Sequence, residues 1–266
     1  MTRKRDDLPI GVVGGGLAGL AAAHELIDRG LRVLILDRDT EDRLGGLAKR
    51  SFGGVMFVDT PHQRKLGIDD TPELAWSDWL SFADFADDDE WPRRWARTYV
   101  ERSTELVFDW LTGCGVTFLP LVNWAERGLH RPGNSVPRWH IAWGTGHAII
   151  ESVAAALEGH DRRDRLEIRF GHRVERLLIE AGRVVGCAGV TEDDGADFEA
   201  RAEHVVLASG GICGGDLGKG RNIQIVHVQE KGFYAAIPMS EGAEIQGEVQ
   251  LGQIRQCVTG RRCRTR

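Results

Sequence analysis

Residues 10–37 read IGVVGGGLAGLAAAHELIDRGLRVLILD. An apolar, strand-prone run breaks into three glycines at positions 14–16, and a helical pattern follows as far as Ile27. Gly30 ends that helix, and a second apolar run leads to Asp37. This order predicts a strand, a tight turn, a helix and a second parallel strand, which together form one βαβ unit with a right-handed crossover.

Glycines at positions 14, 16 and 19 give the spacing G-x-G-x-x-G, and each has a physical reason. Gly14 lets the chain turn sharply out of the strand, and Gly16 leaves room for a pyrophosphate to approach the backbone. Gly19 lets the helix pack closely on the strand. The N–H groups that begin the helix, around Leu17 and Ala18, would then receive the phosphates at the positive end of the helix dipole.

Asp37 stands at the end of the second strand, about 20 residues after the glycines, where an acidic side chain can accept hydrogen bonds from a ribose. A carboxylate at this position disfavours the 2′-phosphate of NADP. The stretch therefore predicts a dinucleotide-binding site. The alternative is a glycine-rich turn in a parallel sheet that binds no ligand.

The composition of the 266-residue chain is that of a globular protein, with 42% hydrophobic and 28% charged residues. Its net charge of −6 gives no general attraction to nucleic acid or to an anionic membrane. The apolar run at residues 10–27 is broken by glycines and carries His24 and Glu25, so we expect neither a signal peptide nor a membrane span. Five scattered cysteines without a C-x-x-C pair indicate reduced thiols, so we expect a cytoplasmic protein without a metal site.

Two Gly-Gly pairs follow the acidic residue, at Gly45–Gly46 and at Gly53–Gly54. Glycine pairs at this place predict that the backbone comes close to a large ligand. The plainer interpretation is a pair of flexible turns.

Residues 60–113 have a helical pattern, with a helix start at Thr71-Pro72 and a further helix expected at residues 92–111. All eight tryptophans lie between Trp76 and Trp143. They either supply buried area to a small helical subdomain or form an aromatic wall over a flat ligand. The acidic run at residues 87–90 is interpreted as a solvated turn, with metal binding as the alternative.

Arg138 and His140 alternate along an extended segment and would share one face of it. They are either structural residues or groups that face a substrate. A helix is expected from His147 to Leu157, followed by strands joined by tight turns at residues 166–170, 173–179, 184–190 and 204–208. The fold class is therefore α/β: a parallel sheet and a β-meander, with a helical, Trp-rich insertion.

These segments, taken in order, resemble the FAD-binding dehydrogenases of the fumarate reductase/succinate dehydrogenase flavoprotein superfamily, and within it proteins near the 3-ketosteroid dehydrogenases. The matching segments are GVVGGGLAGLAAAHEL, RVLILD, LGGLAKRSFGG, the WAERG to WGTG region, HRVERLLIEAGRVVGCAGV and VVLASGG. The resemblance implies a Rossmann-like FAD-binding domain at residues 1–60 and 147–215. It further implies a helical insertion at residues 61–146 and an atypical tail at residues 216–266.

The same resemblance implies how FAD would be held. The glycine turn would bind the pyrophosphate, Asp37 the adenosine ribose, and the backbone of Val174 the adenine. Some members attach FAD through a histidine in the second glycine region, but none occurs between Arg43 and Gly54, so we expect a noncovalent flavin. The implied cofactor contacts are Gly14, Gly16, Leu17, Ala18, Gly19, Asp37, Arg38, Gly45, Gly46, Leu47, Ser51, Gly53, Gly54, Val174, Ala208, Ser209 and Gly210.

The resemblance stops after Gly211. The last twelve residues contain five arginines and no acid, which indicates either a nucleic-acid-binding tail or, as we expect from the abrupt change, a truncated gene or a shifted reading frame. We predict an FAD-dependent dehydrogenase fragment that moves a hydride between flavin and a small organic substrate, next to a carbonyl. The alternatives are an inactive flavin- or nucleotide-binding remnant and an NAD-binding protein. The catalytic residues and the oligomeric state stay open.

Overall fold

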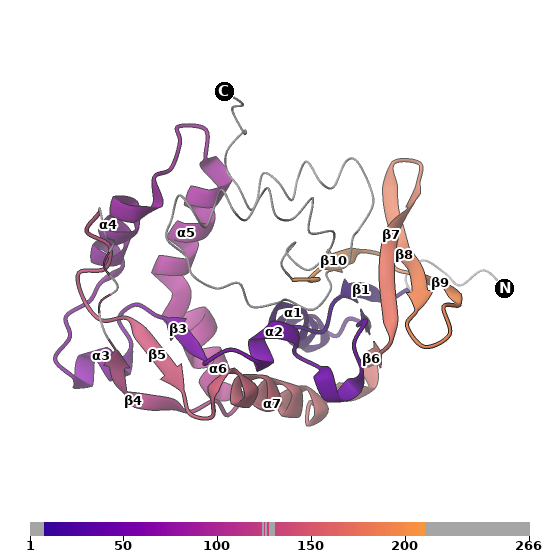
Figure 1. The fold of residues 1–266 in the computed structure, drawn as a ribbon, viewed down its shortest axis with the longest axis horizontal. Coiled ribbons are helices and arrows are strands. Elements are labelled where there is room, and N and C mark those ends of the chain that lie inside the picture. Colours follow the sequence, from indigo (N-terminus) through magenta and orange to yellow (C-terminus); the bar gives the residue numbers. More distant parts are fainter. Residues whose placement is uncertain (1–7, 124, 126, 128–130, 211–266) are drawn as a thin grey trace. The chain divides into compact units, whose positions relative to one another are not determined.

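The computed structural model describes residues 8–123, 125, 127 and 131–210 (Figure 1). The chain divides into two compact units. The described part of the first unit is residues 8–48 and 154–210, and that of the second is residues 49–153 with the gaps just given. The predictions for the tail at residues 216–266, and for Trp124 and the last three cysteines, lie outside the described residues.

A parallel four-stranded sheet of order β10-β1-β2-β6 forms the centre of the first unit. Strands β1 and β2 are buried along their whole length, as is usual for a parallel sheet. The helix between them buries a stripe that includes Leu20, Ala23 and Ile27, so the predicted βαβ unit is confirmed. The elements are β1 (Ile10–Val13), α1 (Leu17–Asp28), β2 (Val33–Leu36), β6 (Leu166–Arg169) and β10 (Val205–Leu207).

A β-meander completes the first unit, and Figure 1 shows β7 and β8 as a long hairpin. Ala181 and Gly182 at its tip both have positive φ, at 48° and 74°, which is the backbone of a two-residue turn that suits the strand twist. The strands are β7 (His172–Glu180), β8 (Arg183–Thr191) and β9 (Asp197–Arg201). One buried cluster joins the meander to the parallel sheet: Val13, Leu34, Leu36, Val174, Cys187 and Ala200.

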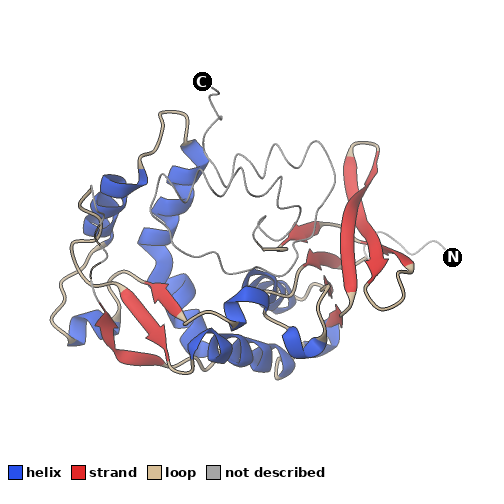
Figure 2. Cartoon of the chain, in the orientation of Figure 1, coloured by secondary structure: helices blue, strands red, loops and turns tan. Residues whose placement is uncertain are grey.

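The second unit combines helices with an antiparallel sheet of order β3-β5-β4 (Figure 2). The predicted insertion is therefore not purely helical, because two of these strands lie within it. Thr71 begins α4 as predicted, and its hydroxyl accepts the N–H of Leu74 at 3.1 Å. The elements are β3 (Gly54–Met56), α3 (Pro61–Lys65), α4 (Pro72–Ala83), α5 (Glu90–Ser103), α6 (Asp109–Gly113), β4 (Phe118–Asn123) and β5 (Trp139–Ala142).

The helix expected at residues 92–111 is present, because residues 90–113 are helical throughout. A π-helical turn (Thr104–Phe108) lies between α5 and α6. The ring of Phe108, at the end of this turn, packs against the rings of Phe57 and Phe118 in the core of the second unit. Helices α2 (Gly46–Lys49) and α7 (Thr145–Glu158) contain the points at which the chain passes from one unit to the other.

Three tryptophans are mostly exposed, namely Trp91 (60%), Trp95 (70%) and Trp143 (71%). The interpretation of the tryptophans as buried packing residues is therefore wrong for these three. Trp76 and Trp79 do pack, because both contact the buried cluster of the second unit around α4 and α5.

The structure also describes two of the cysteines, the acidic run at residues 87–90 and the helices that could be compared with a membrane span. Cys114 and Cys187 are not joined in a disulfide bond. The acidic run at residues 87–90 leads into α5, and Asp89 accepts the N–H of Ala86 at 2.8 Å. Within the described ranges, no helix is both long enough and apolar enough to span a membrane.

Candidate functional site

Gly14 is the point at which the glycine turn leaves β1. Its φ is +102°, and a Cβ there would lie 2.5 Å from the carbonyl oxygen of Ala208. The N–H of Gly14 donates to the carbonyl of Leu36 at 2.9 Å, and that of Ala208 donates to Val13 at 2.8 Å. The turn is thus fixed between the ends of β2 and β10, where a side chain at position 14 has no space.

Gly16 and Gly19 differ in their surroundings. A Cβ on Gly19 would overlap with the carbonyl oxygen of Gly14, so this glycine lets α1 pack on the turn. A Cβ on Gly16 would meet no atom within 4 Å. Gly16 is the N-cap residue, no side chain caps the helix, and its first turn has no acidic residue. The start of α1 therefore offers N–H groups and open space, the combination that binds a phosphate.

Asp37 supports this turn directly. Its Oδ2 accepts the N–H of Gly15, and its Oδ1 accepts the N–H of Asp39 at 2.7 Å. Burial raises the pKa of Asp37, and the two N–H groups offset only part of that effect. Each carboxylate oxygen has a second lone pair, so two acceptor positions remain for hydroxyl donors such as those of a ribose.

Gly15 is a functional residue that the sequence prediction missed. A Cβ there would lie 2.6 Å from Oδ2 of Asp37 and 2.8 Å from Cδ1 of Leu44. The hydrogen bond to Asp37 therefore requires a glycine at this position. The signal was present in the sequence, because the run has a third glycine that the G-x-G-x-x-G spacing does not use.

The glycine pair at positions 45 and 46 lies beside the turn. The N–H of Gly45 donates to the carbonyl of Gly15 at 3.0 Å, and Gly45 forms a parallel bridge with Gly16. Gly46 has a φ of 54°, and its Cβ position is 4.0 Å from Cα of Gly16. Leu47 follows in α2. The structure therefore brings this pair together with the start of α1.

Arg38 lies just after β2, and Val174 lies near the start of β7. Arg38 follows Asp37 and pairs with Glu192 at 2.9 Å. Val174 is buried, at 2% exposure. A bulge begins at this residue, because Val174 pairs with Gly189 whereas the next paired residue of β7 is Arg176. The backbone between Val174 and Arg176 therefore departs from the regular pairing of β7 with β8.

The segment after β10 contacts the other face of the turn. Cα of Ser209 lies 3.0 Å from the Cβ position of Gly14, and Gly210 has a φ of 83°. Together with Ala208, these residues border the glycine turn. The first unit thus collects the predicted positions at 14–19, 37–38, 45–47, 174 and 208–210.

Ser51, Gly53 and Gly54 lie in the second unit, where their conformation has its own explanation. A Cβ on Gly53 would lie 2.5 Å from the carbonyl carbon of Thr145, and a Cβ on Gly54 would overlap with the ring of Phe52. The carbonyl of Ser51 accepts the N–H of Gly146 at 2.9 Å. These glycines are required by local packing, so by themselves they do not indicate a ligand.

Arg138 is buried in the second unit, at 1% exposure, and has a structural role there. Its guanidinium forms a bidentate pair with Asp70, at 2.9 and 2.7 Å, and donates to Asp78 at 2.7 Å. Asp78 also accepts the N–H of Ser135 at 2.8 Å. Burial would raise the pKa of Asp78, but Ser135 and Arg138 outweigh it and lower the pKa. Sequence reasoning found neither aspartate.

His140 is fully buried and has both ring nitrogens engaged. Nδ1 donates to the carbonyl of Arg138 at 2.9 Å, which leaves Nε2 to accept the hydroxyl of Thr60 at 2.7 Å. The N–H of Gln63 donates to the same hydroxyl at 3.2 Å. Burial lowers the pKa of His140 to about 4. A neutral ring held in this way is a packing residue rather than a group that exchanges protons with a substrate.

The FAD binding domain family matches residues 10–253, which is most of the chain and includes the whole glycine turn. The chain belongs to the FAD binding domain family. Its cofactor is therefore FAD, which also favours the flavin over the nicotinamide interpretation of the fingerprint.

Two curated relatives are KsdD-like steroid dehydrogenases. The one from Mycolicibacterium smegmatis is 46% identical over 230 residues, covering 79% of this chain and 41% of the relative. The one from Mycobacterium tuberculosis is 47% identical over 222 residues, covering 76% and 38%. The chain thus spans about two fifths of the length of these relatives.

Solved structures share the fold. The 3-ketosteroid-Δ4-(5α)-dehydrogenase from Rhodococcus jostii RHA1, in complex with 4-androstene-3,17-dione, matches with a TM-score of 0.68 at 24% identity, over 90% of this chain and 53% of that chain. The open conformation of a flavocytochrome c3 fumarate reductase matches with a TM-score of 0.63 at 23% identity, over 78% and 34%. The α/β fold and the resemblance to this flavoprotein superfamily are therefore confirmed.

The glycine turn fits FAD on three structural grounds. The space beside Gly16 is open, whereas any side chain there would fill it. The start of α1 has no side-chain cap and no acidic residue that would repel a diphosphate. Asp37 keeps acceptor positions beside the turn, where the ribose of a bound dinucleotide would donate its hydroxyl hydrogens.

Proposed function

We propose that the chain provides the FAD-binding part of a flavin-dependent dehydrogenase. The observation that carries this proposal is the open space at Gly16, at the uncapped start of α1. It occurs in a chain that is 46% identical to a protein named as a steroid dehydrogenase. Bound FAD supplies a ring that exchanges hydride with an organic substrate, whereas the protein holds the cofactor and excludes water.

In this proposal the backbone holds most of the cofactor. The N–H groups of Leu17 and Ala18 receive the pyrophosphate, and Asp37 accepts the ribose hydroxyls. The flavin is noncovalent, because no histidine stands between Arg43 and Gly54. The other proposed contacts are Gly14, Gly16, Gly19, Arg38, Gly45, Gly46, Leu47, Ser51, Gly53, Gly54, Val174, Ala208, Ser209 and Gly210. Residues 1–60 and 147–215 form the FAD-binding domain of this proposal, and residues 61–146 the insertion.

The proposed substrate is a steroid or another flat, apolar ketone, oxidised or reduced next to its carbonyl. The names of the two mycobacterial relatives support this class. Arg138 and His140 are not the catalytic pair in this proposal, because both are buried and their polar atoms are engaged within the second unit. The five scattered cysteines, which contain no C-x-x-C pair, support a cytoplasmic location.

A second candidate is a chain that binds flavin but does not turn over. It rests on the described contacts of the glycine turn, which account for cofactor binding and assign no catalytic group. Reduction of the bound flavin by a substrate distinguishes the two candidates.

The test is anaerobic reduction of the purified chain loaded with FAD. The proposal expects bound flavin to be bleached by dithionite and, separately, by 4-androstene-3,17-dione or its saturated analogue. Bleaching by dithionite alone would support the inactive candidate. A folded chain that retains NAD and not FAD would contradict both.

A further inference from the structure

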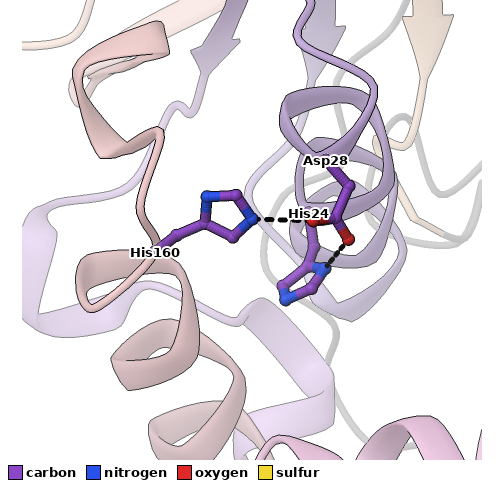
Figure 3. Close-up of side chains that lie close together, drawn as sticks. All are labelled: His24, Asp28 and His160. Carbon is purple, nitrogen blue, oxygen red and sulfur yellow. Dashed lines mark hydrogen bonds and ion pairs between the residues drawn. The ribbon is translucent and has the colours of Figure 1, made fainter.

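Two histidines and one aspartate converge at the C-terminal end of α1, the end opposite the glycine turn (Figure 3). His24 and Asp28 stand one helical turn apart, and His160 follows α7. Nδ1 of His24 is 3.3 Å from Oδ2 of Asp28, and Nε2 of His160 is 2.9 Å from Oδ1. The candidate ligand atoms of all three side chains lie within 4.8 Å of one another.

We propose that His24, Asp28 and His160 form a binding site for a divalent transition metal, with Zn²⁺ as the representative ion. Two imidazole nitrogens and one carboxylate oxygen form a donor set that Zn²⁺, Co²⁺ and Ni²⁺ accept, whereas Mg²⁺ and Ca²⁺ prefer oxygen alone. Bonds of about 2.0–2.1 Å in a tetrahedron place neighbouring donor atoms about 3.3 Å apart. The two distances to Asp28 are already close to this value.

The side chains are also held in a suitable way. The imidazoles of His24 and His160 are 17% and 12% exposed, and their rings meet edge to face at a centroid distance of 5.4 Å. Asp28 is 51% exposed, so a water molecule can occupy the remaining coordination position. The pair at positions 24 and 28 has the spacing that places two ligands on one helix face.

Metal binding requires one change at His160. Its Nδ1 accepts the N–H of Arg162 at 2.9 Å, so a neutral ring carries its proton on Nε2, the atom that faces Asp28. A metal at Nε2 requires the proton to move to Nδ1, and the N–H of Arg162 must then turn to water. Arg162 is exposed, so water can replace the lost acceptor. The amide of Arg162 therefore reports whether the site is occupied.

The site would reinforce a contact that the protein already makes. The guanidinium of Arg162 donates to the carbonyl of Asp28, and that of Arg165 donates to the carbonyl of Gly30 at 2.7 Å. Helix α1 has no basic residue in its own last turn, so these arginines complement the negative end of its dipole. A helix of 12 residues is about 18 Å long, so the proposed metal has a structural role, remote from the phosphate-binding end.

The first test is titration of the purified full-length chain with Zn²⁺ by calorimetry and with Co²⁺ by visible absorption. We expect one ion per chain with a Kd of about 10 μM or tighter, and no binding of Mg²⁺ or Ca²⁺. Asp28→Asn and His160→Gln should each weaken binding about tenfold or more. His204→Gln is the matched control, because His204 is an exposed histidine of the same unit outside the cluster. No binding by the wild type, or equal affinity in all variants, would overturn the proposal.

The second test uses the backbone amide of Arg162 and needs no variant. Addition of Zn²⁺ should shift its NMR resonance and speed its hydrogen exchange, because it loses the acceptor on His160. An ion that binds while leaving this amide unchanged would contradict the proposed ligand set. Circular dichroism on both ligand variants separates a lost site from a lost fold.

Discussion

Oδ2 of Asp37 accepts the N–H of Gly15, which fastens the end of β2 to the glycine turn. The bond leaves no room for a Cβ on Gly15, so the carboxylate and the third glycine depend on each other. Asp37 therefore has two functions in our account. It fixes the turn before the cofactor arrives, and its remaining lone pairs accept the ribose hydroxyls.

Asp37→Ala should weaken FAD binding by about 1.5–3 kcal/mol, the scale for hydrogen bonds to a charged group. This loss corresponds to roughly a ten- to hundredfold higher Kd. Flavin fluorescence quenching during a titration with FAD measures it. Asp39→Ala is the control, because it removes a carboxylate that pairs with Arg43 at 3.9 Å but keeps the backbone N–H that donates to Asp37, so it should leave the Kd unchanged. Equal affinity in wild type and Asp37→Ala would remove Asp37 from the site.

Gly16→Val should lose FAD binding, whereas Gly19→Ala should lose folding stability. A side chain at position 16 meets open space, so the variant should keep its melting temperature but lose FAD, whose pyrophosphate needs that space. A Cβ at position 19 overlaps with the carbonyl of Gly14, so that variant should lose stability before any ligand is added. Thermal melts with and without FAD distinguish the two effects. Retention of FAD by Gly16→Val would contradict the proposed pyrophosphate contact.

His140 should make the free energy of unfolding depend on pH. Burial lowers its pKa from 6.5 to about 4, so between these values the unfolded chain binds more protons than the folded one. The contribution of neutral His140 to the free energy of unfolding is therefore fully present above pH 6.5 and is lost as the pH falls toward 4. The loss is on the order of 3 kcal/mol, at about 1.36 kcal/mol per pKa unit. Urea unfolding at pH 7 and at pH 4.5 measures it.

His140→Gln provides the comparison, because other groups also titrate in this range, including His62, whose pKa burial lowers as well. The variant should lose less stability than the wild type between the two pH values. Identical pH dependence in both proteins would show that His140 is not held neutral.

Arg138→Met should destabilise the second unit by about 3–5 kcal/mol, because it leaves the buried carboxylates of Asp70 and Asp78 without their cation. Chemical denaturation measures this loss. Arg64→Met is the matched control, since Arg64 pairs with Asp59 at the surface and should change stability little. If both variants unfold at the same denaturant concentration, the buried network has no structural role.

The local parts of the fold could be predicted from the sequence. The βαβ unit, the Thr71-Pro72 helix start and the β7–β8 hairpin each depend on residues close together in the chain. Strands β4 and β9 were missed, because β4 has an irregular pairing with β5 and β9 is a charged strand at the edge of its sheet. The exposure of the three tryptophans could not be predicted either, since composition does not say which positions of a helix or a turn are covered.

The candidate site shows the same limit. The glycine spacing and Asp37 could be identified because the fingerprint is local. The two aspartate partners of Arg138 lie 60 and 68 residues away in sequence, and His160 lies 132 residues from Asp28, so only the folded chain brings them together. Gly53 illustrates the opposite error, because its conformation is explained by Thr145 without any ligand.

We propose that the backbone at the start of α1 holds the pyrophosphate of FAD. A crystal structure of the chain with bound FAD is the decisive measurement. We expect pyrophosphate oxygens within hydrogen-bonding distance of the N–H groups of Leu17 and Ala18, with the ribose on Asp37. Electron density that places the cofactor elsewhere, or a turn whose space at Gly16 is filled by a protein side chain, would contradict it.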